Sequence, residues 1–509
     1  MFMKKYLLLG LIMAAIVVVS ITSCVHKPPA QTIESDGNFP QEVARILVNK
    51  CAISGCHNAA SYANANNLLL DSWDHLFDGG RSGAEVVPYS PQYSPLLYFV
   101  NTDSSLGTVA VPSMPVSTTA YPQSPLTKAE YETLEAWIAK GAPDKNGNIA
   151  FASNADTRQK IYISQQGCDL MAVIDAQKHV VMRYIPIGAS ATSIESPHCV
   201  RMSADGMYAY TSFLNGNYVQ KIDTRTDQVT GAANVGMLKA NGSWNILYVA
   251  PADTAVVTTS WVSDGILAYI NAGTMTVAPS RTLGGGSTLV YPHGITSNRS
   301  FDTFFITAQF GNVIYKISSD ASLYKEISLN GLAPVTSTDS TTSAPNPHEI
   351  LMSSDYSRYF VTCQTTNDVR IMDAHSDTLI ARIPVGIFPQ EMAISTTEPY
   401  LFVTCMEDVS TVSGMKGSVY VINYNTLETR VIYGDFYQPH GITVDDINGL
   451  VYVVSTNANP TGPAPHHATA CTGRAGWYSV YNLHTLQPVN NYRYQVTVMP
   501  YSAAARFKR

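Results

Sequence analysis

Charged side chains are scarce in this chain: Asp, Glu, Lys and Arg together make up 14% of its 509 residues. Lys and Arg number 31 against 38 for Asp and Glu, which gives a formal net charge of -7, and the basic residues form no long run. A nucleic-acid-binding surface needs clustered basic side chains, so we do not expect nucleic acid as a partner. The length exceeds that of one ordinary core and indicates two or more domains or a large repeat array.

Signatures of common enzyme classes are also lacking. The sequence shows no convincing Ser/His/Asp arrangement and no paired catalytic carboxylates, so no catalytic residue is assigned. Gly284-Gly-Gly286 follows a strand-like segment without a helical pattern after it, which predicts a turn rather than a phosphate-binding loop. Tyr (30) and Gly (33) are abundant, with many Ser and Thr, a composition typical of strands and turns.

The first 24 residues predict a signal for export. Two lysines precede an apolar run over 7–21, as in a secretory signal peptide. The run ends in Ile21-Thr-Ser-Cys24, which resembles the lipobox of bacterial lipoproteins. That resemblance implies that Cys24 is acylated and becomes the mature N-terminus, anchored to a membrane through lipid. The alternative is an uncleaved transmembrane anchor in which Cys24 has no role.

The predicted location is therefore extracytoplasmic, where disulfides and covalent cofactor attachment both occur. Val25 rather than Asp follows the cysteine, so nothing favours retention at the inner membrane, and the outer membrane is the favoured site of a bacterial lipid anchor.

A polar, Pro-containing tether over 25–38 leads to a predicted small all-α domain over 39–146. Pro40 opens a helical pattern that leads the chain to Cys51. At the other end, Thr127-Lys-Ala-Glu130 is a capping box that begins a second helix.

Directly after the first of these helices stands Cys51-Ala-Ile-Ser-Gly-Cys56-His57. Two cysteines closed by Cys-His are how c-type cytochromes hold haem: the thiols add covalently to porphyrin vinyl groups and the imidazole ligates the iron. The common spacing is C-x-x-C-H, and this segment resembles the minority of cytochromes c with a wider gap. The alternatives are a local disulfide or two unrelated thiols. We expect one haem c, with Cys51 and Cys56 as attachment sites and His57 as proximal ligand.

Three candidates remain for the sixth iron ligand. Met114 is the one methionine between His57 and the end of the predicted domain, and it stands in a Pro-bounded loop over 111–115. The resemblance to cytochromes c implies a distal methionine on such a loop. His75, in a predicted short amphipathic helix, is the second candidate, and an open or water-filled position is the third. A His/Met pair raises the iron potential and favours electron transfer over gas chemistry.

The region over 157–509 repeats. One unit holds four short segments rich in β-branched and aromatic residues, which predicts a propeller blade. The inner strand of this frame recurs along the chain, and Met499-Pro500-Tyr501 supplies the one missing from the first unit. The prediction is an all-β seven-bladed propeller in which the C-terminal strand closes the first blade. The recurring frames begin at Pro197, Trp244, Pro292, Pro347, Pro389 and Pro439.

This region resembles the YVTN-repeat propellers. Segments such as Phe360-Val-Thr-Cys363 and Phe402-Val-Thr-Cys405 stand where that family has Tyr-Val-Thr-Asn. The resemblance implies the fold only, because such propellers serve many functions.

The second residue of each inner strand is predicted to join a ring at one mouth of the central channel. Four imidazoles in this ring could bind a transition metal, or line a pocket for an anionic substrate or second cofactor. The alternative is that each histidine bonds to the backbone of a neighbouring blade. The ring comprises His198, Asn245, His293, His348, Gln390, His440 and Tyr501.

Of the remaining cysteines, Cys168, Cys199 and Cys471 could pair in an oxidising compartment, and the sequence assigns no partners. Cys363 and Cys405 occupy matching positions in adjacent predicted blades, a separation that argues against a bridge.

Three functions stay open. The first is a membrane-anchored c-type cytochrome that exchanges electrons with a redox partner protein, with the propeller as docking platform. The second is an oxidoreductase with a substrate, metal or second-cofactor site at the histidine-lined mouth. It gains support from an architectural resemblance to certain dihaem nitrite reductases, whose propellers use channel-mouth histidines for a second haem. The third is a non-redox binding lipoprotein, which requires that Cys51 and Cys56 carry no haem.

Overall fold

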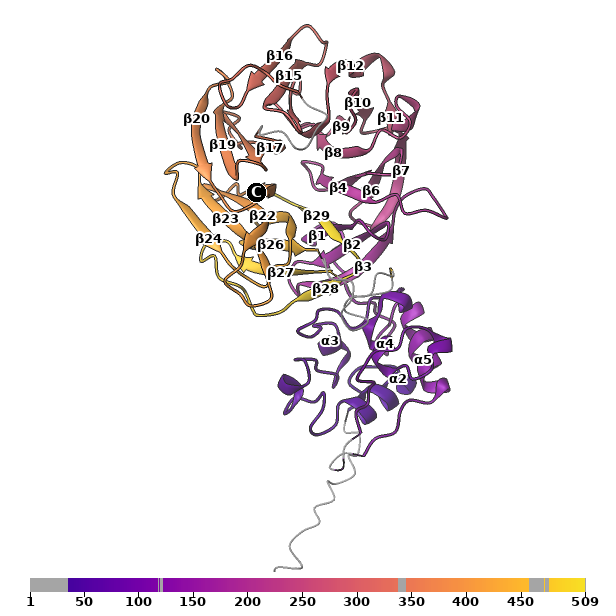
Figure 1. Ribbon diagram of the computed structural model, residues 1–509. Coiled ribbons are helices and arrows are strands. Elements are labelled where there is room, and N and C mark those ends of the chain that lie inside the picture. Colours follow the sequence, from indigo (N-terminus) through magenta and orange to yellow (C-terminus); the bar gives the residue numbers. More distant parts are fainter. Residues whose placement is uncertain are drawn as a thin grey trace, which may run out of the picture.

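The computed structural model describes residues 35–117, 119, 122–336, 345–456, 471 and 476–508. A helical unit precedes a ring of seven β-sheets (Figure 1). The predicted signal with Cys24, and the tether up to residue 34, lie outside the described residues. No helix in the described part of the chain combines the length and apolarity that a bilayer crossing requires.

The helical unit packs its helices around a shared apolar core that includes Val43, Leu47, Leu134 and Ile138. The indole of Trp73 donates to the carbonyl of Ala142 at 2.8 Å, which ties a short helix to the end of the last one. The elements are α2 (Gln41–Ile46), the π-helical turn η1 (Leu47–Cys51), η2 (Tyr62–Asn64), α3 (Trp73–Leu76), η3 (Pro91–Tyr93), α4 (Pro95–Val100), η4 (Ser104–Leu106) and α5 (Lys128–Ala139).

The predicted capping box is present at the start of α5. The Thr127 hydroxyl accepts from the Glu130 amide at 3.3 Å, and the Glu130 carboxylate accepts from the Thr127 amide at 2.8 Å. Glu130 also pairs with Lys50 at 2.5 Å, which joins α5 to the end of η1. The helix ends at Gly141, whose φ is +95° and where a Cβ atom would lie 2.6 Å from the Tyr89 ring.

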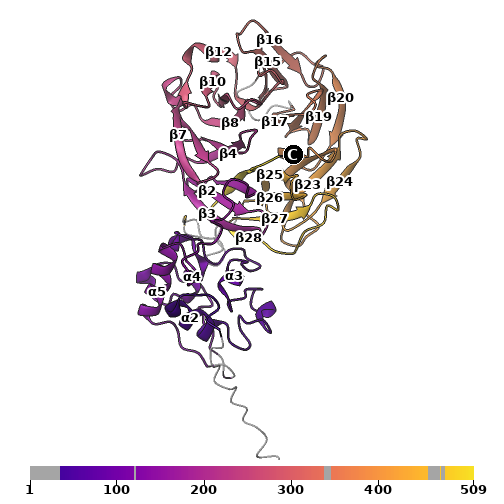
Figure 2. The ribbon, with the colours of Figure 1, turned by 180° about the vertical axis from the view of Figure 1, so that it is seen from behind.

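The seven-bladed propeller is confirmed. β29 pairs with β1, so the last strand of the chain completes the first blade and leaves the ring without an open seam. Figure 2 shows the same ring from behind.

The blades comprise β29 (Pro500–Ala505), β1 (Lys160–Gln165), β2 (Leu170–Asp175) and β3 (Val180–Pro186); β4 (Pro197–Met202), β5 (Tyr208–Phe213), β6 (Tyr218–Asp223) and β7 (Gln228–Asn234); β8 (Trp244–Val249), β9 (Ala255–Ser260), β10 (Gly265–Asn271), β11 (Thr276–Val277) and β12 (Leu283–Leu289); β13 (Pro292–Ser297), β14 (Thr303–Ala308), β15 (Val313–Ser318) and β16 (Tyr324–Ser328); β17 (Pro347–Met352), β18 (Arg358–Cys363), β19 (Asp368–Asp373) and β20 (Leu379–Pro384); β21 (Pro389–Ile394), β22 (Tyr400–Val409), β23 (Lys416–Asn423) and β24 (Thr429–Ile432); and β25 (Pro439–Asp445), β26 (Leu450–Ser455), β27 (Gly476–Asn482) and β28 (Tyr494–Val496). Two 3-10 turns, η5 (Val235–Met237) and η6 (Pro279–Arg281), lie between strands.

Every inner strand shifts its register between its first and fourth residues, as between Pro347 and Ile350 of β17. A bulge of this kind bends the strand and re-aims the side chains within it. The same irregularity in all seven blades therefore sets the direction of the residues that follow each opening residue.

The helical unit lies against blades 1 and 7, beside β3 and β28 (Figures 1 and 2). Main-chain bonds run along the edge of β28: the Gln495 amide donates to the Ser82 carbonyl at 3.0 Å, and the Arg493 amide donates to the Arg81 carbonyl at 3.2 Å. The rings of Tyr93 and Tyr184 meet with centroids 4.9 Å apart. Backbone pairing together with aromatic packing holds the two units in one arrangement.

Candidate functional site

One cavity in the helical unit brings together the four predicted haem residues. Its volume is about 470 Å³, and Cys51, Cys56, His57 and Met114 all line it. Much of the remaining wall is apolar and is supplied by Leu68, Leu70, Leu96, Phe99 and Val100.

The two cysteines follow from how the first helix ends. α2 widens into the π-helical turn η1, which ends at Cys51, and such turns are frequent at functional sites. The chain then turns through Gly55, whose φ is +82°, and the His57 amide donates to the Cys51 carbonyl at 3.1 Å. This bond closes the wide loop between the two thiols, so a four-residue gap still returns both cysteines to the same cavity. Burial raises the pKa of Cys51 to about 12 and also raises the pKa of Cys56.

His57 has one ring nitrogen committed and one left for a ligand. Its Nδ1 lies 3.0 Å from the Leu68 carbonyl oxygen, which requires that Nδ1 carries the proton. Burial lowers the pKa of His57, against the opposing effect of this hydrogen bond, and so favours the neutral ring. A neutral imidazole that donates through Nδ1 presents the lone pair of Nε2, the form that ligates a metal.

The structure separates the two side-chain candidates for the sixth ligand. Met114 lines the cavity, and its amide donates to the Phe99 carbonyl at 2.6 Å, which holds its loop against the end of α4. His75 is exposed and its Nδ1 lies 2.6 Å from the Asp71 carboxylate, away from the residues that line the cavity. Of these two residues, Met114 therefore shares the cavity with Cys51, Cys56 and His57, and His75 does not.

One edge of the cavity is polar and adjoins the propeller. Asn66 and Ser82 line this edge, and the side-chain nitrogen of Asn66 donates to the Ser82 hydroxyl at 3.2 Å. The Ser82 carbonyl is the acceptor for β28, and the neighbouring Asn67 donates to the Tyr492 hydroxyl of blade 7 at 2.6 Å. The wall of the cavity is thus directly bonded to blade 7.

The predicted histidine ring forms, but as a buried layer and not as an open mouth. None of the four histidines is more than 4% exposed. Ring centroids lie 4.0 Å apart for His293 and His348, and 3.6 Å apart for His440 and Tyr501. Tyr501 also stands 4.6 Å from His198. The aromatic rings pack on one another near the propeller axis because every bulged inner strand aims its second residue inward.

Two of these histidines bond to the backbone of a neighbouring blade. Nδ1 of His293 lies 3.2 Å from the His348 carbonyl oxygen, and Nδ1 of His440 lies 3.2 Å from that of Tyr501. Among the described residues, no group of three or more His, Cys, Asp or Glu side chains is arranged to hold a metal ion. The predicted metal site of His198, His293, His348 and His440 is therefore not found in this part of the chain.

Hydrogen-bonding capacity nevertheless remains in this layer. Nε2 of His198, Nδ1 of His348 and Nε2 of His440 are buried without a hydrogen-bond partner. Burial lowers the pKa of His293 to about 4 and that of His440 to about 3, and it lowers the pKa values of His198 and His348 well below their ordinary value. All four rings are thus neutral near pH 7.

A charged cluster next to this ring was not predicted from the sequence. Nη2 of Arg201 lies 3.5 Å from a carboxylate oxygen of Glu391 and 3.7 Å from one of Glu349. Burial is the main cause that raises the pKa of Glu349 to about 8, and burial also raises that of Glu391 while Arg201 opposes it. The repeat contained a sequence signal for this cluster: Glu349 directly follows the ring residue His348, and Glu391 directly follows the ring residue Gln390 of the next blade.

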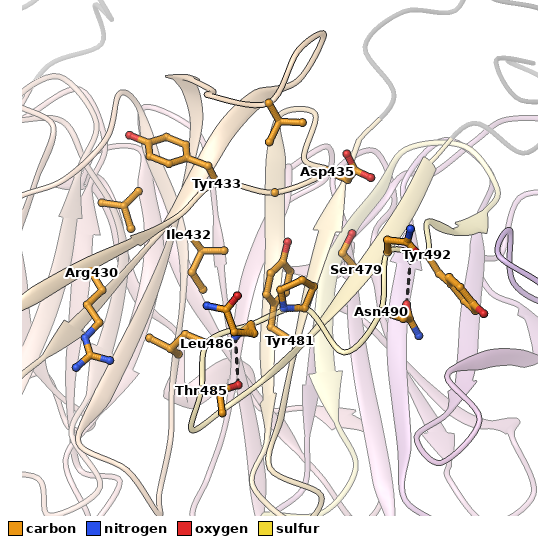
Figure 3. A pocket seen from close by; sticks show the side chains of 16 residues that line it. Arg430, Ile432, Tyr433, Asp435, Ser479, Tyr481, Thr485, Leu486, Asn490 and Tyr492 are labelled. Carbon is orange, nitrogen blue, oxygen red and sulfur yellow. Dashed lines mark hydrogen bonds between the residues drawn. The ribbon is translucent and has the colours of Figure 1, made fainter.

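A groove on the propeller rim was also missed. It has a volume of about 470 Å³ and lies between blades 6 and 7. Figure 3 shows side chains that line it. It forms because β28 is short and pairs with β27 only over 476–478, which leaves the loop through Pro488 and Asn490 to make the far wall. Tyr433, Tyr481 and Tyr492 supply aromatic surface, and the Tyr492 amide donates to the Asn490 side chain at 3.0 Å.

No protein-family model and no curated protein matches this chain. Among solved structures, a functionally unknown protein from Desulfotomaculum acetoxidans is similar with a TM-score of 0.50 and 10% identity, over 69% of this chain and 99% of that one. Kuenenia stuttgartiensis hydrazine synthase gives a TM-score of 0.45 and 15% identity, over 62% of this chain and 92% of that one. The dihydro-heme d1 dehydrogenase NirN, in complex with DHE, gives a TM-score of 0.43 and 11% identity, over 84% and 94%. The likeness to the Desulfotomaculum acetoxidans protein shows the fold alone.

Proposed function

We propose that this chain is an extracytoplasmic c-type cytochrome that transfers electrons to or from a partner protein. The observation that carries the proposal is the single cavity lined by Cys51, Cys56, His57 and Met114. Two thiols that can add to the porphyrin vinyl groups, with one imidazole and one thioether as iron ligands, match a covalently attached, six-coordinate haem. The apolar wall fits the face of a porphyrin, and the neutral His57 ring with a bare Nε2 fits an iron ligand.

Each residue has a defined task in this proposal. Cys51 and Cys56 attach the cofactor, and the main-chain bond from His57 to Cys51 keeps the wide loop closed. The Leu68 carbonyl orients His57, and the Phe99 carbonyl holds the Met114 loop. Bound haem supplies reversible one-electron chemistry at its iron. Leu96, Phe99 and Val100 keep water away from it.

The propeller is proposed as a docking platform for the redox partner. The polar edge of the cavity is bonded to blade 7 through Ser82 and Asn67, so a partner bound to that blade would lie beside the cavity. We further propose that the predicted lipid anchor at Cys24 holds the protein at a bacterial membrane, with the outer membrane favoured.

The test uses the full chain, exported in a host that attaches haem c. The expected product shows a c-type absorption spectrum and a mass increase of one haem. The double variant Cys51→Ala/Cys56→Ala should lose both signals. The matched control Cys168→Ser/Cys471→Ser, which also changes two cysteines but none in the cavity, should keep both. An unmodified wild-type mass from such a host would leave the non-redox binding lipoprotein as the explanation.

A second candidate is an oxidoreductase whose substrate or second cofactor binds in the propeller channel. The three buried histidine nitrogens without partners favour it, together with Arg201, Glu349 and Glu391 beside them. Cofactor and metal analysis of the purified full chain tests this candidate. A second bound group that is lost in His348→Ala would support it. A single haem as the only bound group, with redox properties unchanged in His348→Ala, would remove it.

A further inference from the structure

Two cysteines from opposite sides of the ring-closing seam meet at one place. Cys168 lies in the turn between β1 and β2 of blade 1, and Cys471 lies in the segment between β26 and β27 of blade 7. The Cys471 thiol is 3.5 Å from the carbonyl oxygen of Gly167, the residue directly before Cys168. Burial raises the pKa of Cys168, and the neighbouring Cys471 thiol raises it further. Both cysteines pack in the same apolar cluster.

We propose that Cys168 and Cys471 form a disulfide that fastens blade 7 to blade 1. The other described cysteines have different surroundings: Cys51 and Cys56 line the haem cavity, while Cys199, Cys363 and Cys405 are fully buried within strands. The proposal rests on the proposed extracytoplasmic location, because disulfides persist on that side of the membrane.

The turn that carries Cys168 is held rigidly against the last residues before β29. The Gln166 amide donates to the Met499 carbonyl at 2.9 Å, and the Gly167 amide donates to the Val498 carbonyl at 3.2 Å. Gly167 is required there, since a Cβ atom would lie 2.6 Å from the Val498 side chain. Because these bonds already order the backbone at Cys168, closing the bridge to Cys471 costs less conformational entropy.

The cysteine pair lies where the helical unit, blade 1 and blade 7 meet, as its contact with Tyr93 shows. Tyr93 belongs to the helical unit, and burial raises its pKa to about 12 with smaller contributions from Cys168 and Cys471. Its ring also packs at a tilt against Tyr184 of blade 1, with the ring planes 53° apart. The bridge would therefore join both blades directly beneath the helical unit, where the closing strand completes the ring.

The oxidation is a thiol–disulfide exchange with an oxidised thiol–disulfide oxidoreductase. Cys471 is the partly exposed member and Cys168 is buried, so Cys471 meets the donor first. Its thiolate attacks the donor disulfide and forms a mixed disulfide with one donor sulfur. Cys168, as thiolate, then attacks Sγ of Cys471, the bond to the donor breaks, and the donor leaves as a dithiol. The two cysteines lose two electrons and two protons, and the donor gains them.

The test is differential alkylation of the exported full chain, denatured without reductant and mapped by peptide mass spectrometry. We expect a peptide pair bridged through Cys168 and Cys471, while Cys199, Cys363 and Cys405 are alkylated. In Cys168→Ser, Cys471 should become fully alkylated. Alkylation of both thiols in the wild type, or a Cys471 that stays blocked in Cys168→Ser, would overturn the proposal.

A second measurement tests the stapling role. A reductant should lower the thermal midpoint of the wild type by several degrees and leave Cys168→Ser/Cys471→Ser unaffected. An equal response in both proteins would overturn it. The haem assignment is read separately on the peptide over 51–57, so a haem-bearing peptide without the bridge refutes the disulfide alone, and a bridge without haem refutes the cytochrome alone.

Discussion

The Nδ1 atom of His57 lies 3.0 Å from the carbonyl oxygen of Leu68, eleven residues further along the chain. This bond determines which ring nitrogen can ligate a metal, because it occupies Nδ1 and leaves the lone pair of Nε2 available. The Leu70 amide returns a second bond to the His57 carbonyl at 3.0 Å. Main-chain atoms of Leu68 and Leu70 thus hold the proposed proximal ligand.

The redox midpoint potential of the haem tests whether Met114 is the distal ligand. Met114→Ala should keep the covalent haem but lower its midpoint potential by on the order of 0.1 V, because a thioether ligand raises the potential of haem iron. The control His75→Ala changes an exposed histidine paired with Asp71 and should leave the potential unchanged. Potentiometric titration of both variants provides the comparison. A shift in His75→Ala and none in Met114→Ala would reverse the ligand assignment.

The capping box of α5 should contribute measurably to the helical unit. Thr127→Ala removes the hydroxyl that accepts from the Glu130 amide, and we expect a loss of about 1 kcal/mol in the free energy of unfolding of this unit. Thr133→Ala, in the exposed middle of the same helix, is the control. It removes a hydroxyl that donates to the Ala129 carbonyl at 2.7 Å, and it should not destabilise the helix because alanine has the higher helix propensity. Denaturant titration followed by a helix-sensitive signal measures both. Equal effects of the two substitutions would show that the cap is unimportant.

The propeller should lose stability in acid. The pKa of His293 falls from 6.5 to about 4 on folding, so below pH 6.5 the unfolded chain binds more protons than the folded one. The contribution of this histidine is complete above pH 6.5 and is lost progressively as the pH falls toward 4 and below, by up to about 3 kcal/mol. Glu349 acts in the opposite direction. Because folding raises its pKa from 4.5 to about 8, its contribution to the free energy of unfolding is lost as the pH rises toward 8.

The variant His293→Gln separates these effects. It keeps an amide donor for the His348 carbonyl but cannot titrate, so the fall in stability between pH 6.5 and 4 should become shallower. His375→Gln, at an exposed position, is the matched control and should keep the wild-type slope. Unfolding free energies at several pH values give the slopes. An unchanged slope in His293→Gln would contradict the role of the buried ring.

Close packing between blades 7 and 1 gives a further prediction. A Cβ atom at Gly441 would lie 2.4 Å from the Tyr501 carbonyl oxygen on β29, so Gly441→Ala must push the closing strand away. We expect a loss of roughly 2 kcal/mol or more in the free energy of unfolding. At Gly273 the nearest atom to such a Cβ is the Asn271 side chain at 3.3 Å, and Gly273→Ala should be nearly neutral. Similar unfolding midpoints for the two variants would argue against tight closure at this seam.

Local and periodic features were predictable from the sequence. The strand frame that begins at Pro347 and its six relatives predicted seven blades, and the pattern from Thr127 to Glu130 predicted the cap of α5. These features depend on neighbours in sequence or on a repeat, so no long-range contact had to be known.

Features that depend on distant contacts were predicted less well. Burial of the histidine ring follows from the bulges that direct its members toward one another. The charged cluster brings together Arg201 of blade 2, Glu349 of blade 5 and Glu391 of blade 6. The rim groove depends on the short β28 strand, and the docking of Ser82 on that strand joins segments more than four hundred residues apart.

Peptide mass spectrometry of the exported, purified wild-type protein tests the central claim most directly. The account predicts that the peptide over 51–57 carries the mass of one haem, joined through Cys51 and Cys56. An unmodified peptide, or one that has lost only the two hydrogens of a local disulfide, would contradict it.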